Sequence, residues 1–223
     1  SHESPDHWDK TGYALLVAVM LHVLYAEENK SLAGCAEFLS HPERTIAQTL
    51  QTMLTTQHLV DAGGISRVHP YVARGARAMK NKSDNERSGV LSTVLTLLEV
   101  FSDPIIADLT STSDWGVMDL VEAERPVSLY LVVPPSDISR TRPLMRLILN
   151  QVGRRLTERL PDPCRRKVLL MLDEFPALGR LDFFETALAF LAGYGIRAFL
   201  IGQSLNQIEK AYGPSNAILD NCH

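Results

Sequence analysis

The sequence lacks the features of a disulfide-rich, zinc-binding or membrane-spanning protein. Its three cysteines, Cys35, Cys164 and Cys222, are far apart, and none belongs to a Cys-x-x-Cys pair. This pattern predicts neither a disulfide framework nor a zinc site, and it favours a reducing compartment. The longest apolar run, residues 13–25, is broken by His22 and is shorter than the roughly 20 residues that span a bilayer. We therefore expect a soluble chain in which this run is a buried helix.

An excess of charge of one sign and the common metal or nucleophile signatures are also missing. The chain has 22 Lys and Arg against 26 Asp and Glu, a formal net charge of −4, so composition alone does not indicate a nucleic-acid or membrane-surface binder. The seven histidines form no i, i+4 pair with an intervening Glu, and Ser204 has no histidine nearby in sequence. Since 45% of the 223 residues are hydrophobic, we expect one domain or two small ones with a real core.

A phosphate-binding loop is absent as well. None of the 13 glycines is followed by Lys, so the Gly-Lys-Ser/Thr ending of a P-loop does not occur. Without that backbone cradle and its lysine, a triphosphate loses most of its binding contacts. The chain starts without Met and stops at Asn221-Cys222-His223, which we interpret as an excised piece of a longer protein.

The first half of the sequence shows helical periodicity, and we expect no strand in it. The predicted helices are Asp9–Glu28, Leu32–Leu39, one from Pro42 to Gly63-Gly64, a short one after Pro70, and one that follows Ser83 and ends at Asp103-Pro104. Pro42 suits the first position of a helix. Ser83, with Glu86 three residues later, predicts a capping box.

Residues 31–69 also resemble the layout of a winged helix-turn-helix, with two helices and a Gly-Gly hairpin. The helix that would read DNA, Glu43–Leu59, carries one cationic residue, Arg44. Duplex binding draws most of its free energy from phosphate contacts, so we favour helix packing within an all-α domain.

The second half alternates strands with helices. The predicted strands are Val127–Val133, Val168–Leu172 and Ile196–Ile201, and the predicted helices are Ser139–Leu160 and Asp182–Leu191. Uniformly apolar strands in this order predict an α/β fold with a parallel sheet that is covered on both faces. Ligands of such sheets bind at the carboxyl ends of the strands, and polar residues follow two of these ends.

Asp173 and Glu174 come directly after a buried strand, which is the Walker B arrangement. A carboxylate held at a strand tip can orient the water shell of Mg²⁺, and we assign this role to Asp173. The next residue can activate an attacking water, and we assign this role to Glu174. One strand later, Gln203 stands where a RecA-like ATPase has its γ-phosphate sensor. The alternative is that the two acids only end a strand before a loop.

These residues carry a family resemblance. The segments Asp173-Glu-Phe-Pro-Ala-Leu-Gly179, Ala189-Phe-Leu-Ala-Gly-Tyr-Gly-Ile196 and Leu200-Ile-Gly-Gln-Ser-Leu-Asn-Gln207 resemble the TraG-type coupling proteins of conjugation and type IV secretion. Pro126 to Leu144, the opening Asp6-His-Trp-Asp-Lys10 and the closing Asn221-Cys-His223 also fit. The resemblance spans nearly the whole chain and is most specific in the second half.

The resemblance implies an all-α domain over residues 1–122 and part of a RecA-like nucleotide-binding domain over residues 123–223. It implies a parent that is a homo-hexameric ATPase of the bacterial inner membrane, with this piece in the cytoplasm and without membrane contact. The parent would use ATP and Mg²⁺, receive relaxase and other relaxosome proteins with their DNA, and help drive single-stranded DNA into the secretion channel. No cofactor is expected on the piece itself.

The missing phosphate-binding loop departs from the family pattern. In the family this loop lies upstream of the all-α domain, so we interpret its absence as truncation and expect no ATP hydrolysis by this piece alone. The family also places the sensor strand between the Walker B strand and the strand that bears the loop. Residues 196–201 would then lack a neighbour, and a bare apolar edge is a pairing hazard. We expect self-association or poor order there.

A local excess of cations lies between residues 140 and 167. The candidate DNA or subunit contacts are Arg140, Arg142, Arg146, Arg154, Arg155 and Arg159, followed by Arg165, Arg166 and Lys167. They could form a track for DNA phosphates or be only a solvated helix face with a basic linker. A second functional hypothesis is that the all-α domain is a docking module for relaxosome proteins or DNA, without catalysis.

Overall fold

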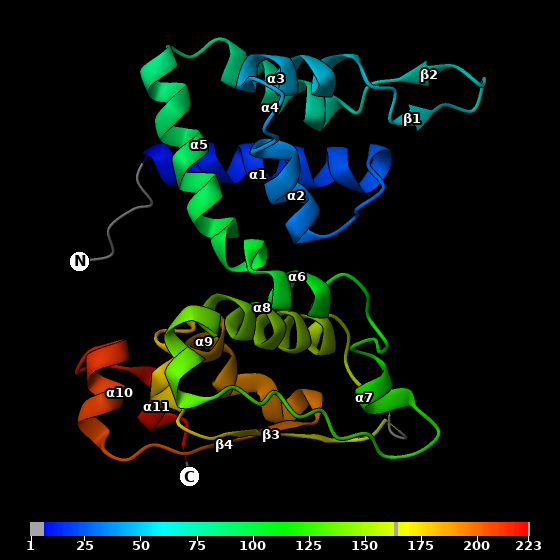
Figure 1. The fold of residues 1–223 in the computed structure, drawn as a ribbon. Coiled ribbons are helices and arrows are strands. Elements are labelled where there is room, and N and C mark those ends of the chain that lie inside the picture. Colours follow the sequence, from blue (N-terminus) through cyan, green and yellow to red (C-terminus); the bar gives the residue numbers. More distant parts are fainter. Residues whose placement is uncertain (1–6, 163–164, 223) are drawn as a thin grey trace. The chain divides into compact units, whose positions relative to one another are not determined.

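The computed structural model describes residues 7–162 and 165–222, with the side chains of residues 7–9 left out. The chain divides into two compact units, Ser1–Ser113 (unit 1) and Asp114–His223 (unit 2) (Figure 1). The domain boundary predicted after residue 122 falls inside unit 2, where the short helix α7 (Asp119–Glu122) buries Val121. Cys164 lies outside the described residues.

Unit 1 is built from helices packed around α1 (His7–Ala26). The other helices are α2 (Leu32–Leu39), α3 (Ile46–Thr55), α4 (Pro70–Lys80), α5 (Asp84–Leu98), a 3₁₀ turn η1 (Glu99–Ser102) and α6 (Pro104–Leu109). Both α4 and α5 pack on α1, and α3 packs on α4. The apolar run of α1 is buried on one side only, with Leu15, Ala18 and Val19 at most 1% exposed. Tyr13, Leu24 and Tyr25 of the same run are 47–68% exposed. No described helix is long and apolar enough to cross a bilayer.

The expectation of no strand in the first half is wrong, because a short hairpin follows α3. Strands β1 (Leu59–Val60) and β2 (Ser66–Arg67) pair antiparallel. The Asp61 side chain accepts hydrogen bonds from the backbone N–H groups of Gly63 (2.9 Å) and Ile65 (3.0 Å) and so shapes the turn. Gly64 takes a positive φ of 79° there, which glycine adopts at no steric cost.

The limits predicted for the third helix are also wrong. Thr45 and Gln48 form a reciprocal capping box, in which the Gln48 side chain accepts from the Thr45 N–H at 2.8 Å. The helix therefore begins at Ile46, four positions after Pro42, and it ends at Thr55 before the hairpin. The capping box of Ser83 and Glu86 is confirmed. Asp103 ends the η1 turn and caps α6.

A chain of hydrogen bonds links buried histidines inside unit 1. The backbone N–H of His69 donates to His58 Nδ1 at 3.2 Å, so His58 carries its proton on Nε2. His58 Nε2 lies 2.8 Å from His22 Nδ1, and His22 Nε2 lies 3.2 Å from Glu27 Oε1. Each imidazole therefore donates through Nε2 and accepts through Nδ1, and both are neutral. A proton added to either Nδ1 removes an acceptor from this chain.

Unit 1 should lose stability in mild acid. Burial lowers the pKa of His22 despite the nearby Glu27 carboxylate, and burial also lowers the pKa of His58. Histidine in an unfolded chain titrates near pH ~6.5, so the unfolded state binds more protons just below that pH. The contribution of the neutral histidines to the free energy of unfolding is therefore fully present above about pH 6.5. It is lost as the pH falls toward the lower pKa values that these histidines have in the folded state. Urea unfolding followed at several pH values measures this.

His22→Leu is the matched variant for this prediction, because it removes a buried imidazole from an otherwise apolar helix face. Its urea midpoint should depend less on pH than that of the unchanged chain. An identical pH dependence in the two proteins would contradict the role of the histidine chain.

Unit 2 contains a parallel pair of strands with helices on one face. Strand β3 (Val168–Leu172) pairs with β4 (Ile196–Leu200), from Val168 opposite Ile196 to Leu172 opposite Leu200. Helices α8 (Ile138–Thr157) and α9 (Asp182–Leu191) pack on this pair through Val152, Leu156, Ala187 and Leu191. Helices α10 (Leu205–Tyr212) and α11 (Ala217–Asp220) follow β4. The strand–helix–strand order over residues 168–200 is confirmed.

Two expectations for the sheet are wrong. Residues 127–133 form no strand, since nothing in the described chain pairs with them, and Tyr130 and Val132 are 81% and 85% exposed. The sheet is also not covered on both faces, because Leu169, Met171 and Phe199 are each more than half exposed. All the helices that pack on the sheet lie on its other face. The apolar pattern of residues 127–133 predicted an extended backbone, but it could not show whether a neighbouring strand is there to pair with it.

The exposed sheet face should make the chain self-associate. Met171 and Phe199 are opposite each other in the register, and clustered exposed apolar side chains mark association surfaces. Met171→Lys with Phe199→Lys should weaken association about 10²–10⁴-fold, since each side chain contributes about 1.5–3 kcal/mol when buried. Sedimentation velocity over a concentration series measures this. Leu97→Lys, a change at an exposed leucine of α5, is the control, and equal effects of the two changes would contradict the prediction.

Candidate active site at the carboxyl edge of the sheet

Asp173 and Glu174 lie directly at the carboxyl end of β3. The ladder between the strands continues past their ends, because Ile201 N–H donates to Leu172 O at 3.0 Å and Phe175 N–H donates to Ile201 O at 2.9 Å. These two bonds bracket the acids and fix them at the sheet edge. Asp173 is exposed, and one of its oxygens accepts the backbone N–H of Glu174 at 3.2 Å. Neither acid makes an ion pair with any residue that the structure describes.

Glu174 has a left-handed backbone, with φ 48° and ψ 42°. It is the one described residue other than glycine with a positive φ. Such a conformation costs about 1–3 kcal/mol and persists only where the surroundings enforce it. Here the 3₁₀ turn η3 (Phe175–Leu178) begins at the next residue, and Ala177 N–H donates to Glu174 O at 2.8 Å. The strained backbone turns the Glu174 side chain toward the end of β4.

Gln203, beyond the end of β4, contacts Glu174 directly. Its Nε2 donates to Glu174 Oε1 at 3.0 Å. Its own backbone N–H donates to Gln207 Oε1 at 3.1 Å, which anchors Gln203 to the first turns of α10. Gly202 allows the approach of the two loops, because a Cβ at this position would lie 3.2 Å from Pro176 Cγ. The three predicted site residues are thus brought together on one edge.

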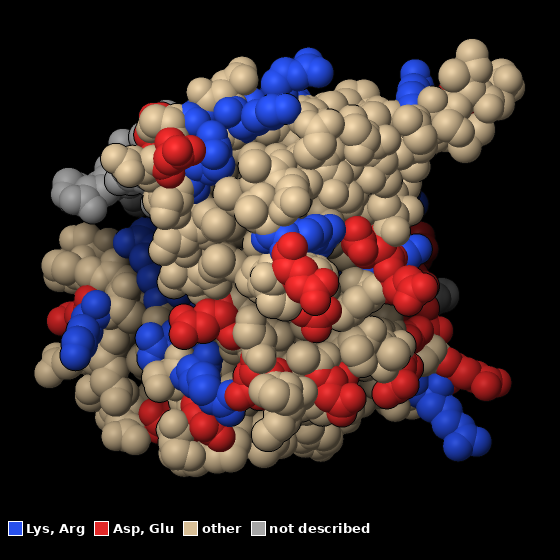
Figure 2. Space-filling model, turned by 45° about the horizontal axis from the view of Figure 1, so that its top comes forward, with Lys and Arg blue, Asp and Glu red and all other residues tan. Residues whose placement is uncertain are grey.

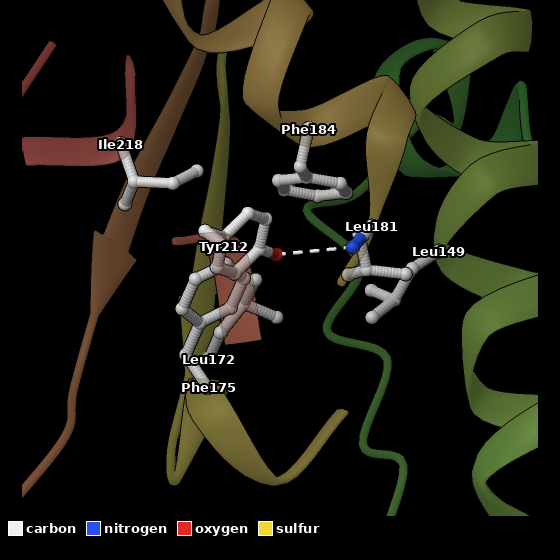
Figure 3. Packing of buried hydrophobic residues seen from close by; sticks show 7 residues of the cluster. All are labelled: Leu149, Leu172, Phe175, Leu181, Phe184, Tyr212 and Ile218. Atoms are coloured by element: carbon white, nitrogen blue, oxygen red, sulfur yellow. Dashed lines mark hydrogen bonds between the residues drawn. The ribbon is translucent and has the colours of Figure 1, made fainter. Parts of the chain in front are cut away.

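An aromatic cluster under the edge holds the turn that follows Glu174 (Figure 3). Phe175 is fully buried, and its ring stacks on Tyr212 with centroids 5.7 Å apart and packs near Phe184. The Tyr212 hydroxyl accepts the backbone N–H of Leu181 at 3.1 Å. Burial raises the pKa of Tyr212, so the phenol stays neutral. Phe175, the residue after the two acids, therefore anchors this part of the site in the core.

The cations of α8 do not form one continuous track. Arg140 lies 3.5 Å from Asp137, Arg155 lies 2.5 Å from Glu158, and Arg154 stacks over the Phe183 ring at 5.5 Å. Arg142 and Arg146 are half-buried, whereas Arg159 is exposed. Their use as DNA or subunit contacts stays a prediction.

Arg165 and Arg166 have structural contacts. Arg165 donates to the Leu156 carbonyl at 3.3 Å, and Arg166 donates to the carbonyls of Ala123 and Glu124. These bonds tie the segment before β3 to the end of α8 and to the residues after α7. A cavity of about 530 Å³ opens beside Glu124 and Arg166, and none of the three predicted site residues lines it. The candidate site is therefore separate from this cavity.

Sequence reasoning missed two residues that shape this edge, Gln207 and Phe175. The i, i+4 spacing of Gln203 and Gln207 at a helix start was a readable signal for the first. The role of Phe175 had no local signal, because its partner Tyr212 is far along the chain. The described residues contain no group of three or more His, Cys, Asp or Glu side chains that could hold a metal ion.

The chain thus joins a helical unit to an α/β unit whose parallel strands end in Asp173, Glu174 and Gln203. The chain belongs to the family described as Type IV secretory system Conjugative DNA transfer, whose profile matches residues 2–223. The resemblance to TraG-type coupling proteins is thereby confirmed.

Individual relatives agree with this assignment. The conjugal transfer protein TraG of Escherichia coli is 38% identical over 97% of this chain and 36% of its own length. Protein VirD4 of Agrobacterium fabrum is 40% identical over 52% of this chain and 17% of its own length. The structure of the bacterial conjugative coupling protein TrwBdeltaN70, in complex with sulphate, matches 94% of this chain and 44% of that chain with a TM-score of 0.65. At 18% identity, that match shows the fold alone. The chain spans about a third of the length of its TraG relatives.

Proposed function

We propose that unit 2 is part of a RecA-like nucleotide-binding domain of a conjugative coupling ATPase, and that unit 1 is the all-α domain inserted in it. The carrying observation is the hydrogen bond of 3.0 Å between Gln203 and Glu174. It joins side chains from two neighbouring parallel strands at the edge where ligands of such sheets bind. A strand end that needed only a polar cap would not require a strained glutamate oriented by an amide from the next strand.

The donor set at this edge fits Mg²⁺ but does not complete a nucleotide site. Asp173 presents an exposed carboxylate, and Mg²⁺ in phosphoryl-transfer sites is held by one or two carboxylates, waters and substrate phosphates. The phosphate contacts themselves must come from elsewhere, because no glycine of the chain is followed by Lys. In the family the loop upstream of the all-α domain supplies them. ATP and Mg²⁺ therefore belong to the proposal for the longer protein.

Each residue of the edge has a distinct task in this proposal. When bound, ATP would supply the phosphoanhydride, and Mg²⁺ would neutralise charge that develops on its oxygens. Asp173 would hold the metal through hydrogen bonds that its carboxylate accepts from the water shell. Glu174 accepts the proton of the attacking water. Gln203 keeps one oxygen of Glu174 occupied, which leaves the other oxygen to face the water.

The names of the relatives support a proposal for the binding partners of the longer protein. TraG is named for conjugal transfer, and the VirD4 proteins of Bartonella are named as coupling proteins of type IV secretion systems. We extend this role to the protein that contains this chain, with relaxosome proteins, single-stranded DNA and channel proteins as partners. A homo-hexamer at the inner membrane, with this piece in the cytoplasm, completes the proposal.

A mating experiment tests the function. This chain replaces the matching segment of E. coli TraG, and plasmid transfer is scored in cells that lack their own TraG. The chimaera should restore transfer, and Asp173→Asn should return transfer to the level of the deletion, because the amide cannot accept from metal-bound water in the same way. Asp220→Asn, at an exposed acid of α11, is the control. Transfer by the Asp173→Asn chimaera at the level of the control would contradict the proposal.

A further inference from the structure

A run of cations in unit 1 is not explained by the site on unit 2. Between residues 66 and 82 the sequence has five cations and no Asp or Glu, in a chain with a net charge of −4. The five are Arg67, Arg74, Arg77, Lys80 and Lys82. Three of them, Arg74, Arg77 and Lys80, belong to α4, and we call their surface the α4 basic face. Figure 2 shows blue side chains over the upper part of unit 1, on the side where α4 leads into α5.

The packing of α4 fixes the direction of these cations. Val72, Ala76 and Met79 form its buried stripe, each at most 1% exposed. Gly75 lets α4 cross α1 closely, because a Cβ there would lie 2.5 Å from the Cβ of Ala18. Arg74, Arg77 and Lys80 are at helical spacing on the opposite, exposed half. The basic face is thus presented by a rigid helix whose apolar side is already used.

The charges of this face are not neutralised inside the protein. Arg67 and Arg77 make no side-chain hydrogen bond or ion pair with the described residues, and Arg74 stacks over the Tyr71 ring at 4.2 Å. Lys80 donates to the neutral amide of Gln51 at 3.2 Å.

The nearby acids have other partners. Asp84 pairs with Arg87 at 2.9 Å, and Asp61 binds the backbone of its own turn. Glu86 accepts from the Ser83 backbone and lies 4.0 Å from Lys82. Arg74 and Arg77 therefore remain available to an external anion.

The neighbouring helix adds uncharged polar groups to the same surface. Gln48, Gln51 and Thr55 line the exposed side of α3, and the Lys80–Gln51 bond shows that the two helices share this surface. The sequence disfavours a winged helix-turn-helix because the would-be recognition helix, Glu43–Leu59, carries one cation, Arg44. The structure shows that the cations lie on the helix after the hairpin instead.

We propose that the α4 basic face binds the phosphodiester backbone of DNA, without reading its sequence. Guanidinium groups and amides on one rigid surface match the charge and hydrogen-bond acceptors of phosphates. A membrane surface is a poorer occupant, because the apolar stripe of α4 is buried in the unit and cannot insert. The choice of DNA over another polyanion rests on the proposed function, whereas the position and charge of the face do not.

The test is binding of a fluorescent oligonucleotide of about 30 nucleotides, single-stranded or duplex, by the 223-residue chain. Fluorescence anisotropy is read at about 50 and about 200 mM salt. Changing Arg74, Arg77 and Lys80 together to Gln should weaken binding at least about tenfold at the lower salt and reduce the salt slope by about 2. Changing Arg74 and Arg77 to Lys should retain binding and its salt dependence, which separates loss of charge from loss of fold.

A matched control changes Arg125, Arg197 and Lys210 to Gln, which are exposed cations of unit 2 and give the same loss of charge. This variant should bind DNA as the unchanged chain does. If it loses binding while the α4 variant keeps it, the contact lies on unit 2 and the inference is overturned. Binding of the chain to polyglutamate or to anionic vesicles, without binding to DNA, would overturn it as well. Binding here needs no nucleotide, and Glu174→Gln should leave it unchanged, so failure of this inference and failure of the ATPase proposal are distinguishable.

Discussion

Glu174→Gln should reduce ATP hydrolysis by the TraG chimaera about 10²–10⁴-fold, the usual contribution of a general base. The variant keeps the geometry of the edge, because a glutamine oxygen can still accept the hydrogen bond of 3.0 Å from Gln203. It loses the carboxylate that accepts the proton of water. Nucleotide affinity should change little, since the phosphate contacts lie elsewhere. Phosphate release and binding of a fluorescent ATP analogue measure the two quantities separately.

Glu209→Gln is the control for this variant, because Glu209 lies exposed on α10, away from the acid pair. Its turnover should match that of the unchanged chimaera. Turnover by Glu174→Gln within a few-fold of this control would contradict the assignment of Glu174 as the base. A parallel loss of nucleotide binding would instead point to a structural role for Glu174.

Phe175→Ala should destabilise unit 2 by about 3–5 kcal/mol, the usual cost of truncating a fully buried phenylalanine. The ring packs against Tyr212 and Phe184 (Figure 3) and also holds the turn that keeps Glu174 in its left-handed conformation. The variant should therefore lose both stability and the Glu174–Gln203 contact. Urea unfolding monitored by far-UV circular dichroism measures the first effect, and ATP hydrolysis by the chimaera measures the second.

Tyr212→Phe is the matched variant, since it keeps the stacked ring and removes only the hydroxyl that accepts the Leu181 N–H. Its cost should be about 1–3 kcal/mol, because the Leu181 N–H is left without its acceptor. A Phe175→Ala protein as stable as Tyr212→Phe would show that the cluster does not support the edge.

The strand ends of unit 2 could be predicted because burial and polarity change there within two residues. Val168–Leu172 is a continuous apolar run, and two acids follow it directly. The same pattern located Gln203 after the next strand. Because both strands are parallel, their ends had to meet at one edge, and the Glu174–Gln203 hydrogen bond is the result.

The unpredicted features depend on partners distant in sequence. Residues 127–133 have the composition of a strand, but a strand also needs a neighbour to pair with, and no described residue serves as one. The strands of the unit 1 hairpin could not be predicted from periodicity, because they have two residues each. The histidine chain joins His22 to His58 across 36 positions, and neither residue signals the other locally.

The most direct test of the central claim is a crystal structure of the TraG chimaera with Mg²⁺ and a non-hydrolysable ATP analogue. The account predicts that a water of the metal shell lies within hydrogen-bond distance of Asp173. It also predicts a water held by Glu174 in line with the terminal phosphate, with Gln203 still bonded to Glu174. A nucleotide bound with Asp173 and Glu174 turned to bulk solvent, away from the metal and the terminal phosphate, would contradict the account.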